Sequence, residues 1–211
     1  MNGNFALGGA SHRTDEALAP VKDDPQRQEE AWIARCREGE TQAFCFLVER
    51  YERMVRAVIR RLIATEHDVD DLAQQSFVSA YEKLAQFNGS CQFSTWLCQI
   101  ALNKARDAMR TRRYRQDDLD VYELELEGDD DGPQARLEAQ QEEQRLDRQL
   151  QVALGNLKPE ERELIVLKYI QGYGYDTVAD MLGCTVQAAK VRSFRAREKL
   201  KEILQRFGVE L

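Results

Sequence analysis

Long hydrophobic runs are missing from this chain of 211 residues. A membrane-spanning helix needs about 20 consecutive apolar residues, and residues 1–20 have neither the apolar core nor the early basic cluster of a secretory signal. Only two histidines and five cysteines are present, and no cysteine pair has the CxxC spacing of a structural zinc site. We therefore expect a cytoplasmic chain with reduced thiols, no metal, no cofactor and no segment inserted in a membrane.

Strand patterns and catalytic motifs are also lacking. No segment alternates apolar and polar residues for long enough to predict a sheet. The sequence has no glycine-rich phosphate loop, no metal-ligand cluster and no histidine placed to activate a nucleophile. Asp68, Asp70 and Asp71 could suggest a metal site, but at the start of a predicted helix they complement the helix dipole. The sequence thus predicts an all-α protein without catalytic residues, and not an enzyme.

The net charge of −7 hides an uneven distribution. Residues 104–115 and residues 190–201 each carry six lysines and arginines against a single acidic residue. Between them, residues 117–132 carry nine acidic side chains and no basic one. The chain therefore has two basic patches separated by an acidic spacer, a distribution that permits binding to nucleic acid at either patch.

Composition and periodicity divide the chain into four parts. Residues 1–30 have little apolar periodicity and predict a disordered leader, and residues 116–133 form an acidic linker. Two small helical domains remain, at residues 31–115 and 134–211. Apolar spacing, turns and capping residues predict helices over residues 43–62, 68–84, 95–113 with Ser94 as N-cap, 134–154, 159–172, 175–182 and 186–206.

The last two predicted helices have the pattern of a helix-turn-helix. A short helix, a three-residue turn containing Gly183, and a longer basic helix follow one another. On a helical wheel the packing side of the last helix comprises Ala189, Ser193, Ala196, Leu200, Ile203 and Leu204. The opposite side presents Gln187, Val191 and Phe194 between two basic flanks, which suits a major groove. A solvated basic face of a helical bundle is the alternative, and the short helix and turn before it favour DNA binding.

Two stretches near the C-terminus resemble a known family. Residues 172–183 read GYGYDTVADMLG, and residues 190–200 read KVRSFRAREKL. Both resemble region 4 of bacterial sigma factors, most closely the extracytoplasmic-function (ECF) group of the sigma-70 type, in which this region recognises the minus-35 promoter element. Gly174 and Val191 stand where that group commonly has serine. The wheel and the resemblance together assign minus-35 binding to Gln187, Lys190, Val191, Arg192, Phe194, Arg195, Arg197 and Lys199.

The helix predicted from residue 68 has a similar likeness. Residues 71–81 read DLAQQSFVSAY and resemble the region 2 stretch that, in the family, docks on the clamp helices of the largest RNA polymerase subunit. Gln75 replaces the more common glutamate. On composition alone, ordinary solvent exposure would explain this polar face. The resemblance assigns polymerase binding to Asp71, Leu72, Gln74, Gln75 and Val78.

The next stretch resembles the family's minus-10 recognition and melting segment. Residues 87–97 read FNGSCQFSTWL and residues 100–107 read IALNKARD, with Asn88 in place of the usual arginine. A loop followed by a basic helix stripe suits single-stranded DNA, with a base flipped into the loop. We assign minus-10 binding to Asn88, Gly89, Ser90, Cys91, Gln92, Thr95, Gln99, Asn103, Arg106 and Arg110. Cys91 makes redox control conceivable, and an idle thiol is the favoured interpretation.

The resemblance implies an alternative sigma factor made of a region 2 bundle and a region 4 helix-turn-helix. Its partners would be promoter DNA, core RNA polymerase at the clamp helices and flap region, and an anti-sigma factor. The acidic linker would thread across polymerase and avoid DNA because of its charge. A stand-alone helix-turn-helix regulator, whose N-terminal domain only dimerises, is the competing hypothesis. The two differ in whether residues 71–75 contact polymerase or a second copy.

Overall fold

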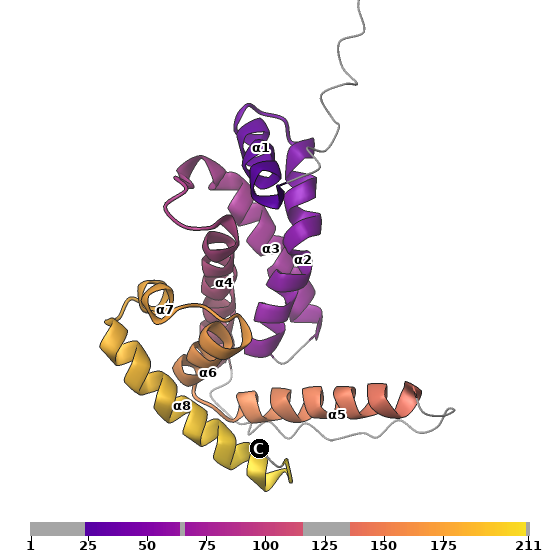
Figure 1. The fold of residues 1–211 in the computed structure, drawn as a ribbon, viewed down its shortest axis with the longest axis vertical. Coiled ribbons are helices and arrows are strands. Elements are labelled where there is room, and N and C mark those ends of the chain that lie inside the picture. The colour runs from indigo at the N-terminus through magenta and orange to yellow at the C-terminus, as the bar shows by residue number, and fades with distance from the viewer. Residues whose placement is uncertain (1–23, 64–65, 116–135, 210–211) are drawn as a thin grey trace, which may run out of the picture. The chain divides into compact units, whose positions relative to one another are not determined.

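The computed structural model describes residues 24–63, 66–115 and 136–209, and in that part of the chain every regular element is helical (Figure 1). The prediction of an all-α fold is confirmed. The acidic linker at 116–133 and most of the leader lie outside the described residues. The main helices are α1 Pro25–Arg37, α2 Gln42–Leu62, α3 Glu66–Glu82, α4 Phe93–Arg115, α5 Arg136–Gly155, α6 Pro159–Ile165, α7 Tyr175–Leu182 and α8 Val186–Arg206. None of them is long and apolar enough to cross a membrane.

The chain divides into two compact units, residues 1–47 and residues 48–211. In the first unit, helix α1 begins at Pro25, so the predicted disordered leader extends too far in residues 25–30. The cause is a helix start that apolar periodicity does not reveal. The side chain of Asp24 accepts a hydrogen bond of 2.9 Å from the backbone N–H of Gln26, and Pro25 supplies the fixed φ of a first helical residue.

Two side-chain contacts hold the rest of the described first unit. The Trp32 and Phe46 rings stack with their centroids 5.3 Å apart. Arg35 donates hydrogen bonds of 2.7 and 2.5 Å to the carboxylate of Glu40, across the turn at Gly39. These contacts fix the direction in which the chain leaves α1.

In the second unit, the part of α2 from Val48 onward, α3 and α4 share a hydrophobic core. Arg56 on α2 also pairs with Asp70 on α3. The buried residues are Val55, Val58, Ile59 and Leu62 of α2, Val69, Leu72, Ala73, Phe77 and Ala80 of α3, and Phe93, Leu97, Ala101, Leu102 and Ala105 of α4. Each large aliphatic side chain buried here stabilises the fold by about 1.5–3 kcal/mol.

Helix α4 begins earlier than its predicted cap. The backbone N–H groups of Thr95 and Trp96 both donate to the carbonyl oxygen of Gln92, at 3.0 and 3.1 Å. Gln92 is therefore the residue before the first helical turn, and Ser94 lies inside that turn. The prediction of Ser94 as N-cap is wrong, because Phe93 is drawn into the core and the helix starts with it.

The C-terminal helices α5, α6 and α8 surround a second apolar cluster. Its buried members are Ala153, Leu154, Leu157, Ile165, Ala196 and Leu200. Helix α6 continues into a π-helical turn, Val166–Ile170, in which the N–H of Gln171 donates to the carbonyl of Val166 at 2.9 Å. The chain then turns at Gly172, whose φ of 75° favours glycine, and this is where the sequence predicted the helix to end.

Candidate nucleic-acid interface

Helices α7 and α8 form the predicted helix-turn-helix with the predicted bounds. Gly183 ends α7 in the left-handed conformation, with φ of 62°, and the N–H of Cys184 donates to the carbonyl of Ala179 at 2.9 Å. The hydroxyl of Thr185 then accepts a hydrogen bond of 3.1 Å from the N–H of Ala188, which caps the start of α8. These local bonds set the direction of α8 relative to α7.

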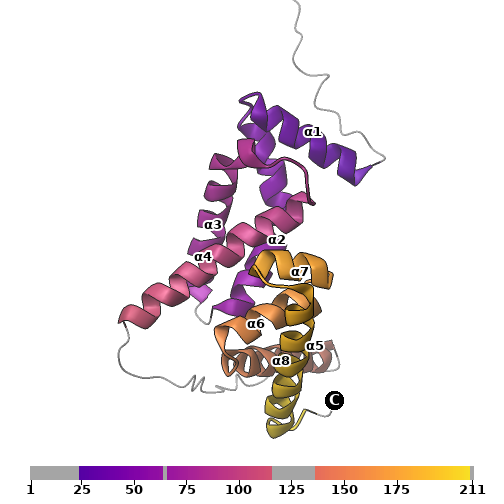
Figure 2. The same cartoon turned by 90° about the vertical axis from the view of Figure 1, so that its left-hand side faces the viewer.

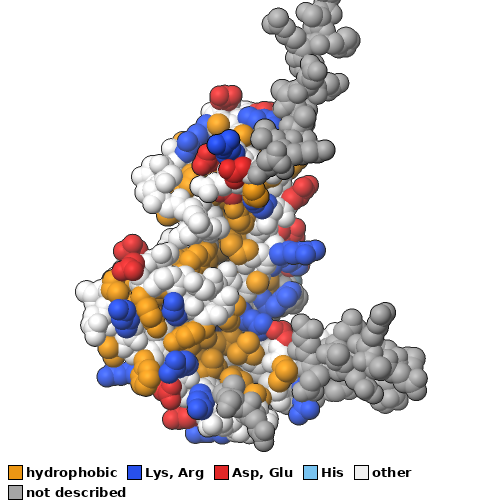
Figure 3. Space-filling view, viewed as in Figure 1, with side chains coloured by type: hydrophobic (Ala, Val, Ile, Leu, Met, Phe, Trp, Pro, Cys, Tyr) orange, Lys and Arg blue, Asp and Glu red, His pale blue; other side chains and the backbone are white. Residues whose placement is uncertain are grey.

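The face of α8 predicted to contact duplex DNA is exposed to solvent. Val191 is 41% exposed and Phe194 is 56% exposed, a large fraction for a phenylalanine. The guanidinium of Arg197 lies 5.3 Å from the centroid of the Phe194 ring. Figure 3 shows Lys and Arg side chains distributed among hydrophobic ones over α7 and α8. Also exposed are the predicted residues Gln187, Lys190, Arg192, Arg195 and Arg197, whereas Ala189, Ser193, Ala196 and Leu200 are buried on the opposite side.

Lys199 differs from the other predicted minus-35 residues. Its ammonium group donates a hydrogen bond of 2.8 Å to the carboxylate of Glu161 on α6. The helical wheel placed this lysine on a basic flank of α8, but it cannot show which partner lies beside a flank. In the structure Lys199 supports the packing of α8 on α6.

Sequence reasoning missed two residues beside this face, Lys168 and Tyr175. The Lys168 ammonium lies 4.6 Å from the centroid of the Tyr175 ring, and Lys190 lies 5.9 Å from it. A hydrogen bond with Tyr169, together with burial, raises the pKa of Tyr175. The sequence signal that could have identified this contact is Tyr175, an aromatic residue at the first position of α7 and three residues after Gly172.

The predicted minus-10 loop, residues 88–92, is exposed and anchored at both ends by aromatic rings. The Phe87 and Phe93 rings meet edge to face with centroids 5.5 Å apart, and Trp96 lies 5.2 Å from Phe87. Inside the loop, the N–H of Ser90 donates to the side-chain oxygen of Asn88 at 3.0 Å, and Gly89 has a φ of 75°. The loop therefore has a fixed base and a solvent-exposed tip.

On α4, two of the predicted DNA-facing residues, Gln99 and Arg106, contact the C-terminal helices. Arg106 donates two hydrogen bonds of 2.8 Å each to the carboxylate of Glu163 on α6. Gln99 donates to the backbone carbonyl of Met181 on α7 at 3.1 Å. Asn103 lies between them and accepts hydrogen bonds from both side chains, while Arg110 pairs with Asp107 at 2.9 Å. Sequence reasoning did not predict these partners.

The predicted polymerase-binding face of α3 is exposed with one exception. Asp71, Gln74 and Gln75 are exposed, and Val78 is an aliphatic side chain with 52% of its surface in solvent. Leu72 is only 7% exposed, so it packs in the core and supports this face from beneath. The structure thus brings four of the five predicted residues to one surface.

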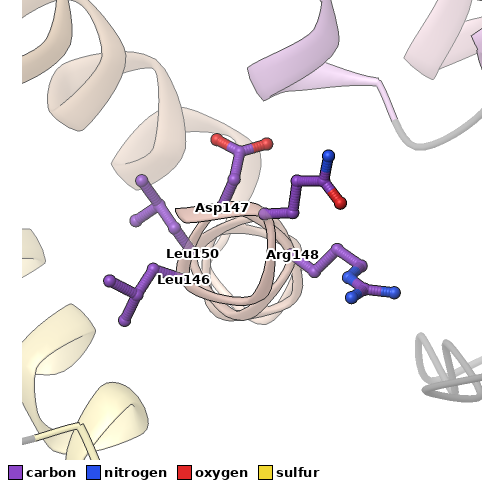
Figure 4. A pocket seen from close by; sticks show the side chains of 5 residues that line it. Leu146, Asp147, Arg148 and Leu150 are labelled. Atoms are coloured by element: carbon purple, nitrogen blue, oxygen red, sulfur yellow. The ribbon is translucent and has the colours of Figure 1, made fainter. Parts of the chain in front are cut away.

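A hollow of the surface is lined by Gln144, Leu146, Asp147, Arg148 and Leu150, which all come from α5. In Figure 4, Leu146 and Leu150 lie on one side of that helix and Arg148 on the other. No group of three or more metal-ligating side chains occurs within the described ranges. All five cysteines are free thiols, and Cys91 is exposed.

Comparison with known proteins agrees with this geometry. Residues 47–115 match Sigma-70 region 2, and residues 147–200 match Sigma-70 region 4. The RNA polymerase sigma factor NccH of Alcaligenes xylosoxydans xylosoxydans is 35% identical, with 84% of this chain and 95% of the relative covered. The ECF RNA polymerase sigma-E factor of Haemophilus influenzae is 29% identical, with 85% and 97% covered. The chain belongs to the ECF subfamily of sigma-70 factors.

Two solved structures have a similar fold. CnrH in complex with the cytosolic domain of CnrY is 31% identical, with a TM-score of 0.61, and the match covers 84% of this sigma factor and 97% of CnrH. The sigma factor RpoE in complex with the anti-sigma factor NepR from Bartonella quintana has a TM-score of 0.62 at 23% identity, with 78% and 98% covered, and shows the fold alone. Both region matches fall inside the predicted domains at 31–115 and 134–211. A stand-alone regulator does not account for region 2.

Proposed function

We propose that this sigma factor binds core RNA polymerase, recognises the minus-35 and minus-10 elements of a promoter and promotes opening of the duplex. The observation that carries the proposal is the joint occurrence of region 2 and region 4 in one chain, with the predicted recognition side of α8 exposed. A helix-turn-helix alone would suit many regulators. The added region 2 supplies surfaces for polymerase and for a melted strand.

The proposed minus-35 contact uses the N-terminal half of α8 in the major groove. Arg192 and Arg195 would bond to base edges, and Phe194 would contact a thymine methyl group or the sugar edge. Lys190 and Arg197, which lie two turns apart on one flank of the helix, would neutralise phosphates. Val191 has no hydrogen-bonding group, so it favours an apolar contact at its base position.

The proposed minus-10 contact uses the exposed loop at 88–92 and the basic stripe of α4. A base that leaves the stack costs a few kcal/mol, and a loop with a fixed aromatic base presents its polar tip without first having to order itself. Arg106 and Arg110 would follow the phosphates of the strand that has separated. This assignment gives the arginines of α4 a role in binding the separated strand.

The proposed contact with polymerase is the exposed face of α3. Gln74, Gln75 and Val78 offer amide donors and acceptors around one apolar side chain, a composition that suits a helix-to-helix interface. The acidic linker at 116–133 would thread across polymerase without binding the DNA. The resemblance to ECF sigma factors implies an anti-sigma partner, and the likeness to CnrH, which was solved in complex with the cytosolic domain of CnrY, supports a protein partner for this chain.

Binding to core polymerase tests this proposal without knowledge of the promoter. Purified core enzyme is mixed with a fluorescently labelled full-length chain, and the size-exclusion profile is followed at the dye wavelength. The proposal predicts that the label moves into the core-enzyme peak and that an unlabelled chain displaces it. A chain that elutes alone at every concentration, and instead forms a dimer, would support the stand-alone regulator.

A further inference from the structure

An exposed tyrosine lies beside α8 but outside the helix-turn-helix itself. Tyr169 belongs to the π-helical turn at the end of α6 and is 42% exposed, although the turn begins with the buried residues Val166 and Leu167. A π-turn contains one residue more than an α-helical turn, so it rotates the side chains that follow it, and such turns are frequent at functional sites. The helices α6, α7 and α8 lie side by side in Figures 1 and 2.

The hydroxyl of Tyr169 joins two side chains of the helix-turn-helix. It accepts a hydrogen bond from the guanidinium of Arg197 on α8, because an arginine side chain can only donate. It also hydrogen-bonds with the hydroxyl of Tyr175, the first residue of α7. One neutral hydroxyl therefore links the π-turn to both helices of the helix-turn-helix.

The guanidinium of Arg197 is held by three neighbours. Besides its bond to Tyr169, it donates to the carboxylate of Glu198 at 3.1 Å and lies 5.3 Å from the centroid of the Phe194 ring. The side chain of Arg197 is nevertheless 51% exposed. A guanidinium carries five N–H donors, more than these contacts require. Arg197 is thus an oriented cation that can still bind a ligand from the solvent side.

We propose that Tyr169 is a positioning residue for minus-35 binding, whose hydroxyl holds the guanidinium of Arg197 in the orientation that binds a DNA phosphate. The inference rests on the proposed function, which gives Arg197 this phosphate contact. An arginine that is ordered before binding loses less conformational entropy when it binds. A neutral hydroxyl orients the cation without cancelling its charge, whereas the carboxylate of Glu198 lowers the net charge that a phosphate meets.

A double-mutant cycle on duplex affinity separates positioning from direct contact. Tyr169→Phe removes only the hydroxyl, Arg197→Ala removes the phosphate contact, and a third variant carries both changes. The probe is a labelled duplex of mixed sequence and about 20 base pairs, because phosphate contacts carry no sequence information. Fluorescence anisotropy gives the affinities of the full-length chains at several salt concentrations. The matched control is Tyr81→Phe, which removes the hydroxyl of an exposed tyrosine on α3.

Tyr169→Phe should weaken duplex binding about two- to fivefold, because Arg197 must then be ordered during binding. It should leave the slope of log affinity against log salt concentration unchanged, since the phosphate contact still forms. Arg197→Ala should weaken binding further and reduce that slope by about one. The double variant should bind as Arg197→Ala does, because the hydroxyl acts only through that side chain. Tyr81→Phe should keep the wild-type affinity.

Two results of the cycle would overturn the inference. Wild-type affinity for Tyr169→Phe would show that the hydroxyl has no part in binding. Losses that add up in the double variant would show that Tyr169 acts independently of Arg197.

A second measurement follows Arg197 in the chain without DNA. The ¹⁵N relaxation of its Nε–H group gives an order parameter, which reports motion on the picosecond-to-nanosecond scale. Tyr169→Phe should lower this order parameter, and Tyr81→Phe should leave it at the wild-type value. An unchanged order parameter in Tyr169→Phe would mean that Glu198 and Phe194 suffice to hold the guanidinium, and the positioning role would fall.

Run-off transcription with core polymerase separates a failure of this inference from a failure of the proposed function. If wild type supports transcription while the losses in the cycle are additive, the sigma-factor function stands and the positioning role falls. If wild type supports no transcription while the double variant binds as Arg197→Ala does, Tyr169 positions Arg197 on duplex DNA and the function must be revised.

Discussion

Lys199 and Glu161 form an ion pair of 2.8 Å between α8 and α6. The same Glu161 carboxylate accepts a hydrogen bond of 3.0 Å from the backbone N–H of Lys158, at the start of α6. Burial acts to raise the pKa of Glu161, but the bonds from Lys199 and Lys158 outweigh it and hold this pKa below its ordinary value. One carboxylate therefore caps α6 and fastens the recognition helix to it.

Lys199→Ala is therefore expected to act on stability more than on DNA affinity. The loss in the free energy of unfolding should be about 0.5 kcal/mol, because the pair is partly exposed and screened by solvent. Lys190→Ala is the matched variant, since Lys190 lies on the exposed recognition side. It should leave stability unchanged and reduce the slope of log affinity against log salt concentration by about one. Chemical denaturation and salt-dependent binding to duplex DNA measure the two effects, and the reverse pattern would contradict the assignment.

Arg195→Ala should weaken binding of promoter duplex by about 1–3 kcal/mol, the range for a lost bidentate base contact. Specificity at one base pair of the minus-35 element should relax with it. Arg206→Ala removes the same side chain in the last turn of α8 and should cost much less. Competition binding with a set of single-base variants of the element measures both. Equal losses of affinity for the two variants would show that Arg195 contributes only its positive charge and makes no base-specific contact.

The combined change Gln74→Ala and Gln75→Ala should reduce the affinity for core polymerase while helix α3 stays folded. Both side chains are exposed, so no buried contact is lost and thermal stability should stay within about 0.5 kcal/mol of wild type. Gln86→Ala is a control outside the predicted face. Titration of the labelled chain with core enzyme gives the affinities. Undiminished binding by the double variant would remove this face from the polymerase interface.

Cys98 gives the fold a defined dependence on alkaline pH. Burial raises the pKa of its thiol from 9.0 to about 11. The native state therefore holds the proton more tightly than the unfolded state, so the stabilisation is full below pH 9 and is lost as the pH rises toward 11. At pH 10 the loss due to this thiol is about 1 kcal/mol. Cys98→Ala should show a smaller fall in unfolding free energy between pH 8 and 10 than wild type, and parallel curves would contradict the account.

Gly183→Ala should destabilise the helix-turn-helix by about 1 kcal/mol, because the residue has a φ of 62° that a β-carbon disfavours. An added β-carbon at this position would meet no atom within 4 Å, so the cost comes from the backbone alone. Gly183→Asn should lose less, since asparagine tolerates the left-handed region. Thermal unfolding of wild type, Gly183→Asn and Gly183→Ala should rank their stabilities in that order. A Gly183→Ala variant as stable as wild type would contradict this prediction.

Local features of this fold were predictable and long-range contacts were not. The bounds of α7 and α8 follow from Gly174, Gly183 and Thr185, because turn and capping preferences act within a few residues. The first helix was missed in part, since Asp24 and Pro25 signal a start without any apolar stripe. Wheel positions gave the exposed side of α8 correctly.

The partners of charged side chains could not be derived in the same way. A wheel places Arg106 and Lys199 on polar sides of their helices, but only the packing of α6 brings Glu163 and Glu161 opposite them. Such pairs join residues 57 and 38 positions apart in the chain. No local preference encodes that separation. Both pairs involve residues that the sequence assigned to DNA contacts, and neither pair was predicted.

The most direct test of the central claim is run-off transcription with purified core RNA polymerase, with and without this chain, on a pool of promoter fragments. The account predicts transcripts whose starts appear only when the chain is added, and whose upstream sequences share two elements at minus-35 and minus-10. If no such starts appear while the chain alone retards duplex DNA, the claim that it acts as a sigma factor is contradicted.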